Sequence, residues 1–578
     1  MASVASLLAP RFDAALTAAF GADLAGTDPL LRPSQHADVQ SNVAMGLAKR
    51  LGRNPREVAQ AIVEHLAVDD LCRDAAVAGP GFVNLTLRPE VLAALVTQLD
   101  GPRLGVAPAT RSHTVVVDYS GPNVAKEMHV GHLRSTIIGD AVVRVLEFLG
   151  HEVIRQNHLG DWGTNFGMLI EHLVDLGEEK AAAELSLGDL ARFYQEAREK
   201  FEEDPGFADR ARARVVRFQS GEAESLRLWR LLIEESGRYF DEVYRRLDVT
   251  LTPADMAGES FYNDMLADVA AELEAAGLAV VDDGALCVYP PGFTGRDGAP
   301  FPVIVRKRDG GFNYEATDLA AIRHRARTLG ATWLLYVIGA PQGQRLSMLF
   351  AVARMAGWLG DEHRAEHVAF GSVLGADGKM FRTRAGESVR LVDLLDEAVR
   401  RAAAVVAEKN PSLGEAARAE VAEAVGIGAV KYADLSSDRV KDYVFDFDRM
   451  LSFEGNTAPY LQYAHARIRS IFRRAEVNPF GLDPALLQVV HPAERALALQ
   501  LTGFEPAVTA SAAHLQPHRL CTYLFDVASA FTSFYEACPV IKADSTETRL
   551  SRLVLCDRTA RVLRTGLGLL GIAAPEQL

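Results

Sequence analysis

The pattern of apolar and polar positions predicts a mixed α+β unit at the start of the chain. Apolar residues recur every four positions over residues 4–16, which predicts an amphipathic helix. Residues 79–87 alternate as a strand, with Phe82 and Asn84 on one face and aliphatic side chains on the other. A connector rich in glycine and proline follows at residues 101–108 and marks the end of this unit.

The next stretch has the pattern of a parallel sheet. An apolar strand at residues 114–117, a helix with apolar spacing over 138–149 and a second strand at 152–156 form a βαβ start. The continuous apolar run at 333–338 is typical of a central parallel strand. Between them, residues from about 175 to 245 are rich in Glu, Arg and Ala with helical spacing, which predicts an inserted helical segment.

We therefore predict an α/β plus all-α fold, with a Rossmann-type parallel-sheet catalytic domain, an α+β N-terminal domain and a C-terminal helical bundle. Shorter strand-like runs occur at residues 279–281, 285–289 and 302–306, and the chain becomes almost entirely helical after about residue 386. The predicted domains are residues 1–108, 109–386, 387–454 and 455–578.

Composition narrows the class of protein. Of the 578 residues, 49% are hydrophobic and 24% charged, as in an ordinary globular protein, and no apolar run reaches the roughly 20 residues that span a bilayer. The five cysteines are scattered and odd in number, which argues against a disulfide framework and for the cytoplasm. The net charge of −15 disfavours nonspecific nucleic-acid binding but leaves room for local basic sites, such as the helix that carries Arg467 and Arg469.

A phosphate-binding motif lies where the strand at 114–117 runs into a helix. His129, Gly131 and His132 stand at the helix start, where unpaired N–H groups attract phosphate. Gly131 allows close approach of a ligand, and two imidazoles can donate hydrogen bonds to a developing phosphoryl charge. Two surface histidines are the alternative, which the neighbouring strand, Lys126 and the following helix disfavour.

Two further clusters complete a candidate site. A loop from Gly371 to residue 386 alternates glycines with cations, including Lys379 and Arg382, and can close over a triphosphate. Tyr314 and Asp318 are four residues apart at a predicted helix start.

Asp118, at the carboxyl end of a strand, pairs with Asp318 to suit a planar guanidinium, with Gln342 as a neutral acceptor. A helix N-cap is the alternative role for Asp318, and an ordinary loop residue that for Gln342.

These segments together resemble the class I arginyl-tRNA synthetases, over nearly the whole chain. The matching motifs are residues 118–132, 157–167, 314–318, 425–435, 453–463 and 569–572. The resemblance implies an N-terminal domain that contacts tRNA, a catalytic domain that activates arginine with ATP, a stem-contact region and an anticodon-binding bundle. It implies ATP as a magnesium substrate complex, with no tightly bound cofactor and no protein-bound metal, and L-arginine and tRNA(Arg) as further substrates of a monomeric, cytoplasmic enzyme without membrane association.

The resemblance also assigns residues. The arginine pocket is Asp118, Asn123, Tyr314, Asp318 and Gln342; the ATP site is His129, Gly131, His132, Gly371 and Val373; the catalytic groups are Lys126, His129, His132, Lys379 and Arg382; and the tRNA contacts are Phe82, Asn84, Arg467 and Arg469. Lys126 resembles the lysine that replaces one missing from the basic loop.

The chain departs from the family pattern at a few positions. Arg345 stands where many relatives carry histidine, Ala316 replaces a common threonine, Arg382 replaces a frequent lysine, and the chain ends in Gln-Leu. A specialised or inactive paralogue that binds arginine or tRNA, and a small-molecule nucleotidyltransferase, are the alternatives. The second leaves the first 110 residues and the helical C-terminus without a role.

Overall fold

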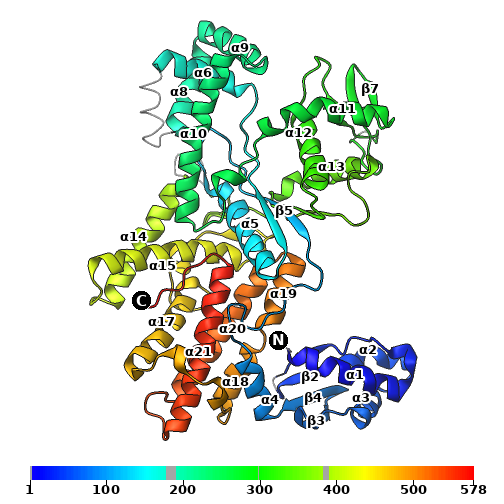
Figure 1. Cartoon of the computed structure of the whole chain (residues 1–578), viewed down its shortest axis with the longest axis vertical. Helices are drawn as coiled ribbons and strands as arrows, with labels where there is room; N and C mark the ends of the chain where they lie inside the picture. Colours follow the sequence, from blue (N-terminus) through cyan, green and yellow to red (C-terminus); the bar gives the residue numbers. More distant parts are fainter. Residues whose placement is uncertain (1–2, 35, 178–189, 297, 382–388) are drawn as a thin grey trace.

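The computed structural model describes residues 3–34, 36–177, 190–296, 298–381 and 389–578. A parallel sheet lies at the centre of the molecule, with inserted helices at one end and the helical bundle beside the N-terminal unit at the other (Figure 1). The predicted fold class is confirmed. Over the part of the chain so described, no helix combines the length and the apolar character needed to cross a membrane.

The N-terminal unit packs three helices on an antiparallel sheet of strand order β1–β2–β4–β3. The strands are β1 (Leu31–Pro33), β2 (Val39–Ser41), β3 (Cys72–Ala78) and β4 (Phe82–Leu87), and the helices are α1 (Val4–Phe20), α2 (Val43–Leu51) and α3 (Pro55–His65). The alternation predicted for β4 is confirmed: Val83, Leu85 and Leu87 are buried in the core, whereas Phe82 and Asn84 are half-buried on the other face.

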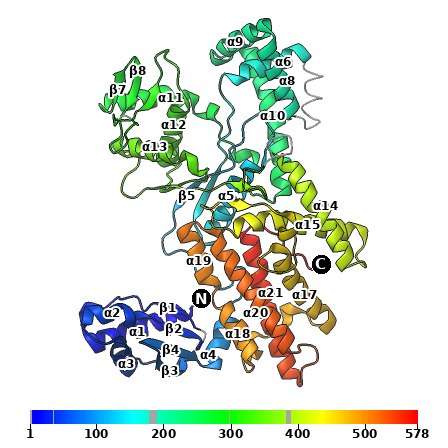
Figure 2. The same ribbon diagram turned by 180° about the vertical axis from the view of Figure 1, so that it is seen from behind.

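This unit has its own hydrophobic core, against which Leu499 of the bundle also packs. Helix α4 (Pro89–Thr97) leads out of it, and α18 (Pro492–Leu501) lies against α4. Arg495 of α18 forms an ion pair with Asp38 and donates to the carbonyl of Leu87 over 2.7 Å. The N-terminal unit is therefore fixed to the helical bundle at this point (Figure 2).

The central parallel sheet has the strand order β11–β10–β5–β6. Its strands are β5 (Thr114–Asp118), β6 (Glu152–Gln156), β10 (Trp333–Tyr336) and β11 (Arg364–His367). Helix α5 (Val130–Phe148) connects β5 to β6, as the predicted βαβ unit requires, and β10 is fully buried beside β5. Because the chain leaves β5 for β6 on one side and returns as β10 on the other, the switch point of the sheet lies between the carboxyl ends of β5 and β10.

The shorter strand-like runs form a separate sheet instead of extending the parallel one. Strands β7 (Ala279–Asp282), β8 (Ala285–Val288) and β9 (Val303–Arg306) are antiparallel. They pack with α11 (Leu266–Ala275), α12 (Tyr314–Arg323) and α13 (Gly343–Met355) around a second hydrophobic core. This subdomain holds α12 and α13 next to the switch point.

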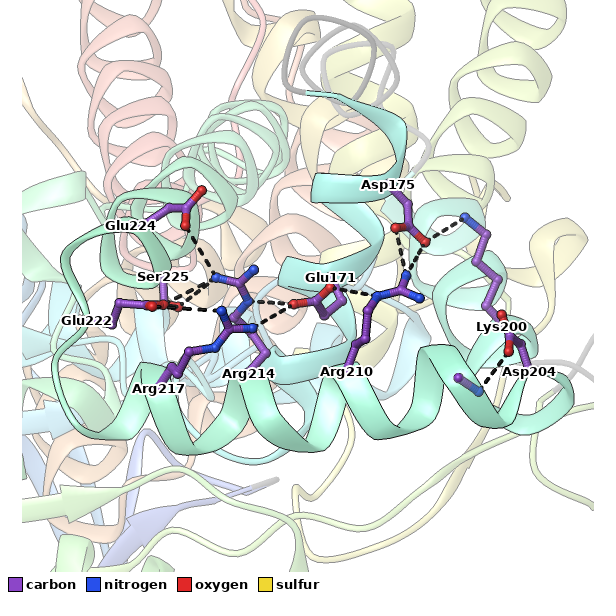
Figure 3. Close-up of polar contacts among 11 residues, drawn as sticks. Glu171, Asp175, Lys200, Asp204, Arg210, Arg214, Arg217, Glu222, Glu224 and Ser225 are labelled. Atoms are coloured by element: carbon purple, nitrogen blue, oxygen red, sulfur yellow. Dashed lines mark hydrogen bonds and ion pairs between the residues drawn. The ribbon is translucent and has the colours of Figure 1, made fainter.

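The helical insertion predicted at about 175–245 contains α8 (Leu190–Glu203), α9 (Pro205–Gln219) and α10 (Ala223–Arg246), and it packs on α6 (Asn165–Leu176), which precedes it. Residues 178–189 lie outside the described part. Three arginines of α9, Arg210, Arg214 and Arg217, point toward the buried carboxylate of Glu171 on α6 (Figure 3). Arg210 also contacts Asp175 over 2.8 Å. The positive charge of these α9 arginines is thus largely compensated by carboxylates of α6.

The rest of the chain is almost entirely helical, as predicted. Its helices are α14 (Leu391–Lys409), α15 (Glu415–Leu435), α16 (Phe447–Met450), α17 (Ala458–Ala475), α18, α19 (Phe504–His514), α20 (Pro517–Ala537) and α21 (Thr546–Leu569). Helices α15, α19, α20 and α21 all contact α5, so the bundle shares one hydrophobic core with the central sheet. The same contacts place the bundle directly below α5 in Figure 1.

Candidate active site

The carboxyl ends of β5 and β10 are joined by a buried arginine. Arg325 lies in a π-helical turn (His324–Thr328) after α12, and its guanidinium is 2.9 Å from the carboxylate of Asp118, the last residue of β5. It also lies 5.0 Å from the ring centre of Tyr336, the last residue of β10. The charge of Asp118 is therefore compensated within the protein, and Asp118 forms part of the wall of the site.

The start of α5 is a reciprocal cap made by two histidines. His129 is the N-cap, and its Nδ1 accepts a hydrogen bond from the backbone N–H of Gly131 over 3.0 Å. The Nδ1 of His132 accepts one from the backbone N–H of His129 over 3.1 Å. A Cβ on Gly131 would lie 2.7 Å from the His129 ring, so only glycine fits between them.

This arrangement fixes the protonation of both rings. Burial lowers the pKa of His129, and the charge of Lys126 lowers it further. Burial lowers the pKa of His132 to about 4. Both rings are neutral near pH 7, and because each Nδ1 accepts a hydrogen bond, each Nε2 carries the proton. Two Nε2–H donors thus accompany the N-terminus of α5, a combination that suits phosphate oxygens.

Lys126 stands close to these histidines, as the sequence motif predicts. Its Nζ lies 4.4 Å from the ring centre of Tyr194 on α8, in a cation–π contact. The effect of Lys126 on the pKa of His129 places its charge near the same ring. The helical insertion therefore holds the lysine beside the start of α5.

The predicted basic loop is connected to the histidine motif through the backbone. Strand β12 (Val373–Leu374) pairs in parallel with β13 (Tyr443–Val444), and a Cβ on Gly371 would lie 2.7 Å from the backbone of Lys441. Lys379 is exposed in the tight turn that follows β12, while Arg382 lies outside the described residues.

The segment after this loop returns to the start of α5. Val130 donates its N–H to the carbonyl of Val389 over 3.0 Å, and Leu391 donates to Met128 over 2.9 Å. Residues 389–391, which follow the basic loop, are thus hydrogen-bonded to the start of α5.

Three of the predicted arginine-pocket residues lie around one point. Tyr314 begins α12, Asp318 lies one turn further along the same helix, and Gln342 precedes α13. All three contact the guanidinium of Arg345, in the first turn of α13. Asn313 caps α12 instead of Asp318, so the carboxylate of Asp318 is not used as a helix cap.

Asn123 lies in the loop between β5 and α5. Its backbone forms a parallel bridge with Gly160, and a Cβ on Gly160 would lie 2.1 Å from the Asn123 side-chain oxygen. The side chain is exposed and rests on the loop that follows β6.

Two acidic residues that the sequence analysis did not single out, Glu259 and Asp161, lie near Asp318. Burial raises the pKa of Glu259 to about 7, with the nearby charges of Asp161 and Asp318 adding to the rise. Ser260 donates to Asp161 from its backbone N–H over 2.8 Å and from its hydroxyl over 2.6 Å. A Cβ on Gly258 would lie 2.2 Å from the carboxylate of Asp161, so the contact between these segments arises in the fold and has no periodic pattern in the sequence.

The residues predicted to contact tRNA lie apart from this site. Phe82 and Asn84 are on β4 of the N-terminal unit. On α17, Arg467 stacks on Tyr463 at 4.6 Å, and Arg469 forms an ion pair of 2.5 Å with Glu576. Both arginines are held by neighbouring groups of the bundle.

Three family models match consecutive parts of the chain. The arginyl tRNA synthetase N-terminal domain matches residues 6–87, the catalytic domain of class I tRNA synthetases (R) matches residues 94–447, and the DALR anticodon-binding domain matches residues 461–578. Curated relatives include an arginine–tRNA ligase of Thermobifida fusca, 59% identical over all of both chains, and one of Frankia casuarinae, 54% identical over 96% of each.

Solved structures agree with these matches over the full length. Arginyl-tRNA synthetase from Plasmodium falciparum is 28% identical, with a TM-score of 0.85, and that of Thermus thermophilus is 27% identical, with a TM-score of 0.79. Each alignment covers 100% of both chains. The chain therefore belongs to the class I arginyl-tRNA synthetase family.

Proposed function

We propose that this protein is an arginine–tRNA ligase that joins L-arginine to the 3′ end of tRNA(Arg) in two steps. The arginine carboxylate first attacks the α-phosphate of ATP, which enters as its Mg²⁺ complex, and pyrophosphate leaves. A ribose hydroxyl at the tRNA 3′ end then attacks the carbonyl of arginyl-adenylate, and AMP leaves. The observation that carries the proposal is the reciprocal histidine cap of α5 in a chain that matches such ligases from end to end.

In the first step, the protein acts by position and charge, without a covalent intermediate. The Nε2–H groups of His129 and His132, with the N-terminus of α5, would bind the charge that develops on the α-phosphate. Lys126 would add a cation beside His129, and the exposed Lys379 would follow the pyrophosphate as the basic loop closes. The removal of one such donor typically costs about 10²–10³ in rate.

The substrate guanidinium would bind between Tyr314, Asp318 and Gln342. A carboxylate matches a planar guanidinium through two parallel hydrogen bonds, which an ammonium cannot form. The neighbouring Glu259 and Asp161 would add negative charge to the same region. Lysine would lose the paired geometry, and uncharged citrulline would leave Asp318 without its counter-charge.

The tRNA would lie along the face that joins the N-terminal unit, the catalytic domain and the bundle. Phe82 and Asn84 would contact its elbow, and Arg467 and Arg469 its anticodon arm. To reach a phosphate, Arg469 would share or release its ion pair with Glu576.

We further propose a monomeric enzyme that acts in the cytoplasm.

Arginine-dependent exchange of label between ATP and pyrophosphate tests the chemistry. With tRNA(Arg) present, exchange is expected for L-arginine and for no other amino acid. Absence of exchange with and without tRNA would contradict ligation and leave the inactive paralogue. Exchange that is indifferent to tRNA would contradict the tRNA dependence expected of the family.

A further inference from the structure

A guanidinium of the protein itself lies in the proposed arginine pocket. Arg345 donates from Nη1 to the carboxylate of Asp318 and from Nε to the side-chain oxygen of Gln342, the latter over 3.1 Å. Its guanidinium carbon also lies 5.1 Å from the ring centre of Tyr314. Tyr314, Asp318 and Gln342 are three of the five residues that the sequence assigns to the arginine pocket, with Asp118 and Asn123 as the other two.

The side chain of Arg345 and the substrate carry the same chemical group. An ion pair, a side-chain carbonyl and an aromatic face are the partners that any guanidinium prefers. Arg345 engages all three at once, so a second guanidinium cannot reach them in the same geometry while Arg345 stays. Two guanidinium charges in this space would also repel each other.

We infer that Arg345 is an internal competitor for arginine, which occupies the guanidinium subsite in the free enzyme and is displaced when the substrate binds. The inference rests on the proposed arginine pocket. It assigns to Arg345 a role in setting arginine affinity that is separate from the chemistry at His129 and His132.

The acidic residues around the pocket explain why a cation of the protein occupies it before arginine binds. Asp318 is grouped with Glu259 and Asp161. Burial raises the pKa of the half-buried Glu315, and the nearby charge of Arg345 opposes that rise. Burying several carboxyls together is costly unless a cation is present or protons are taken up. Arg345 supplies the cation before arginine arrives, and the substrate supplies it afterwards.

The location of Arg345 also permits its release. It stands in the first turn of α13, and 28% of its side chain is exposed, against 1% for Arg325, the arginine paired with Asp118. A partly exposed ion pair contributes little to stability, so solvent can take over the cation at small cost. Arg325 is enclosed on all sides and remains as a fixed part of the wall.

Occupancy by Arg345 reduces the apparent affinity for arginine by the fraction of molecules in which the subsite is open. Removal of the guanidinium should therefore tighten arginine binding, whereas removal of an ordinary pocket residue weakens it. For a pair of this exposure, we expect the Kd of L-arginine to fall about threefold to tenfold.

Calorimetric titration of the full chain with L-arginine tests the inference. Arg345→Met keeps the length of the side chain and removes the charge, and Arg354→Met, on the exposed face of the last turn of α13, is the matched control. A lower Kd in Arg345→Met with an unchanged Kd in Arg354→Met is the expected result. An equal or higher Kd in Arg345→Met overturns the inference.

Arg345→Lys separates occupancy from long-range charge. It keeps the positive charge but loses the planar group that binds Asp318 and Gln342 together. If charge alone acts, its Kd equals that of the wild type; if occupancy acts, its Kd lies between those of the wild type and Arg345→Met. The first of these outcomes contradicts displacement.

A crystal structure of the arginine complex gives a direct second measurement. The guanidinium of Arg345 is expected to have left Asp318, and its persistence there beside bound arginine overturns the inference. Failure of the proposed function has a different outcome: neither the wild type nor any variant then binds arginine. Asp318→Asn, which removes the shared carboxylate, should weaken binding in both the wild-type and the Arg345→Met backgrounds.

Discussion

The guanidinium of Arg134, on α5, lies 3.1 Å from the carboxylate of Asp434 on α15, and both side chains are almost fully buried. Arg134 also donates to the carbonyl of Lys441 over 2.9 Å, and its guanidinium carbon lies 5.2 Å from the ring centre of Tyr443 in β13. One buried side chain thus joins the helix that carries the histidine motif to the helical region and to the strand paired with the start of the basic loop.

Removal of Asp434 should strongly destabilise the protein. Asp434→Ala leaves the charge of Arg134 buried without its partner, which typically costs about 3–5 kcal/mol. The urea midpoint of unfolding, followed by circular dichroism, should fall accordingly. Asp448→Ala, which breaks an ion pair with Arg401 at a carboxylate that is 91% exposed, is the control and should change the midpoint little. Equal midpoints for the two variants would contradict a structural role of the buried pair.

Lys126 should contribute more to the adenylation rate than Lys379. Lys126→Met removes a cation held beside His129, and we expect kcat of pyrophosphate exchange to fall about 10²–10³-fold, with the KM for arginine little changed. Lys379→Met removes an exposed, mobile charge and should cost less. The comparison is made by steady-state kinetics with saturating ATP; a larger loss for Lys379→Met would overturn the proposed division of roles.

Asp318→Asn should raise the KM for arginine and leave the KM for ATP unchanged. The amide keeps the shape of the side chain but loses the charge that pairs with a guanidinium, a loss of about 1.5–3 kcal/mol, or about tenfold to more than a hundredfold. Exchange kinetics with arginine and ATP varied separately measure both constants. If the KM for arginine does not change, Asp318 is not part of the pocket.

Arginine affinity should rise with pH through the titration of Glu259. Because burial raises the pKa of this carboxyl to about 7, it is largely protonated below that pH and becomes charged above it. The cationic substrate favours the charged form, so the Kd of L-arginine should fall between about pH 6 and about pH 8.

The raised pKa of Glu259 also makes the folded protein less stable as the pH rises. The unfolded chain loses this proton near the ordinary pKa of glutamate, so the contribution of Glu259 to the free energy of unfolding is fully present below that pH and is lost as the pH rises toward about 7.

The control for the pH dependence of arginine binding is Glu259→Gln, which cannot ionise and should flatten the pH dependence of the Kd. An equally steep profile in this variant would assign the dependence to another group.

Local patterns were sufficient to predict much of the fold and part of the site. The alternation of Val83 and Leu85 with Asn84 and Thr86 predicted β4, and the apolar strand before His129 and His132 predicted a helix start there, because both depend on residues near in sequence. The reciprocal cap that the two histidine rings form was not predicted. The grouping of Tyr314 with Asp318 follows from one turn of α12.

The features of the site that were not predicted from the sequence depend on contacts between segments that are distant along the chain. Arg325, which forms the ion pair with Asp118, lies in a π-helical turn. Such turns have no periodic sequence pattern from which they could be predicted. Arg134 and Asp434 are separated by 300 residues. Glu259 acquires its altered pKa from burial against Asp161 and Asp318, which only the folded chain brings together.

The formation of arginyl-tRNA is the most direct test of ligation by this protein. Purified protein, ATP and labelled L-arginine are incubated with tRNA(Arg), and acid-precipitable label is followed in the wild type and in His132→Ala. The wild type should charge tRNA(Arg) with arginine and not with lysine, and His132→Ala should do so about 10²–10³-fold more slowly, because one of the two Nε2–H donors is gone. Absence of charging by the wild type, or equal rates for the two proteins, would contradict ligation at the histidine cap of α5.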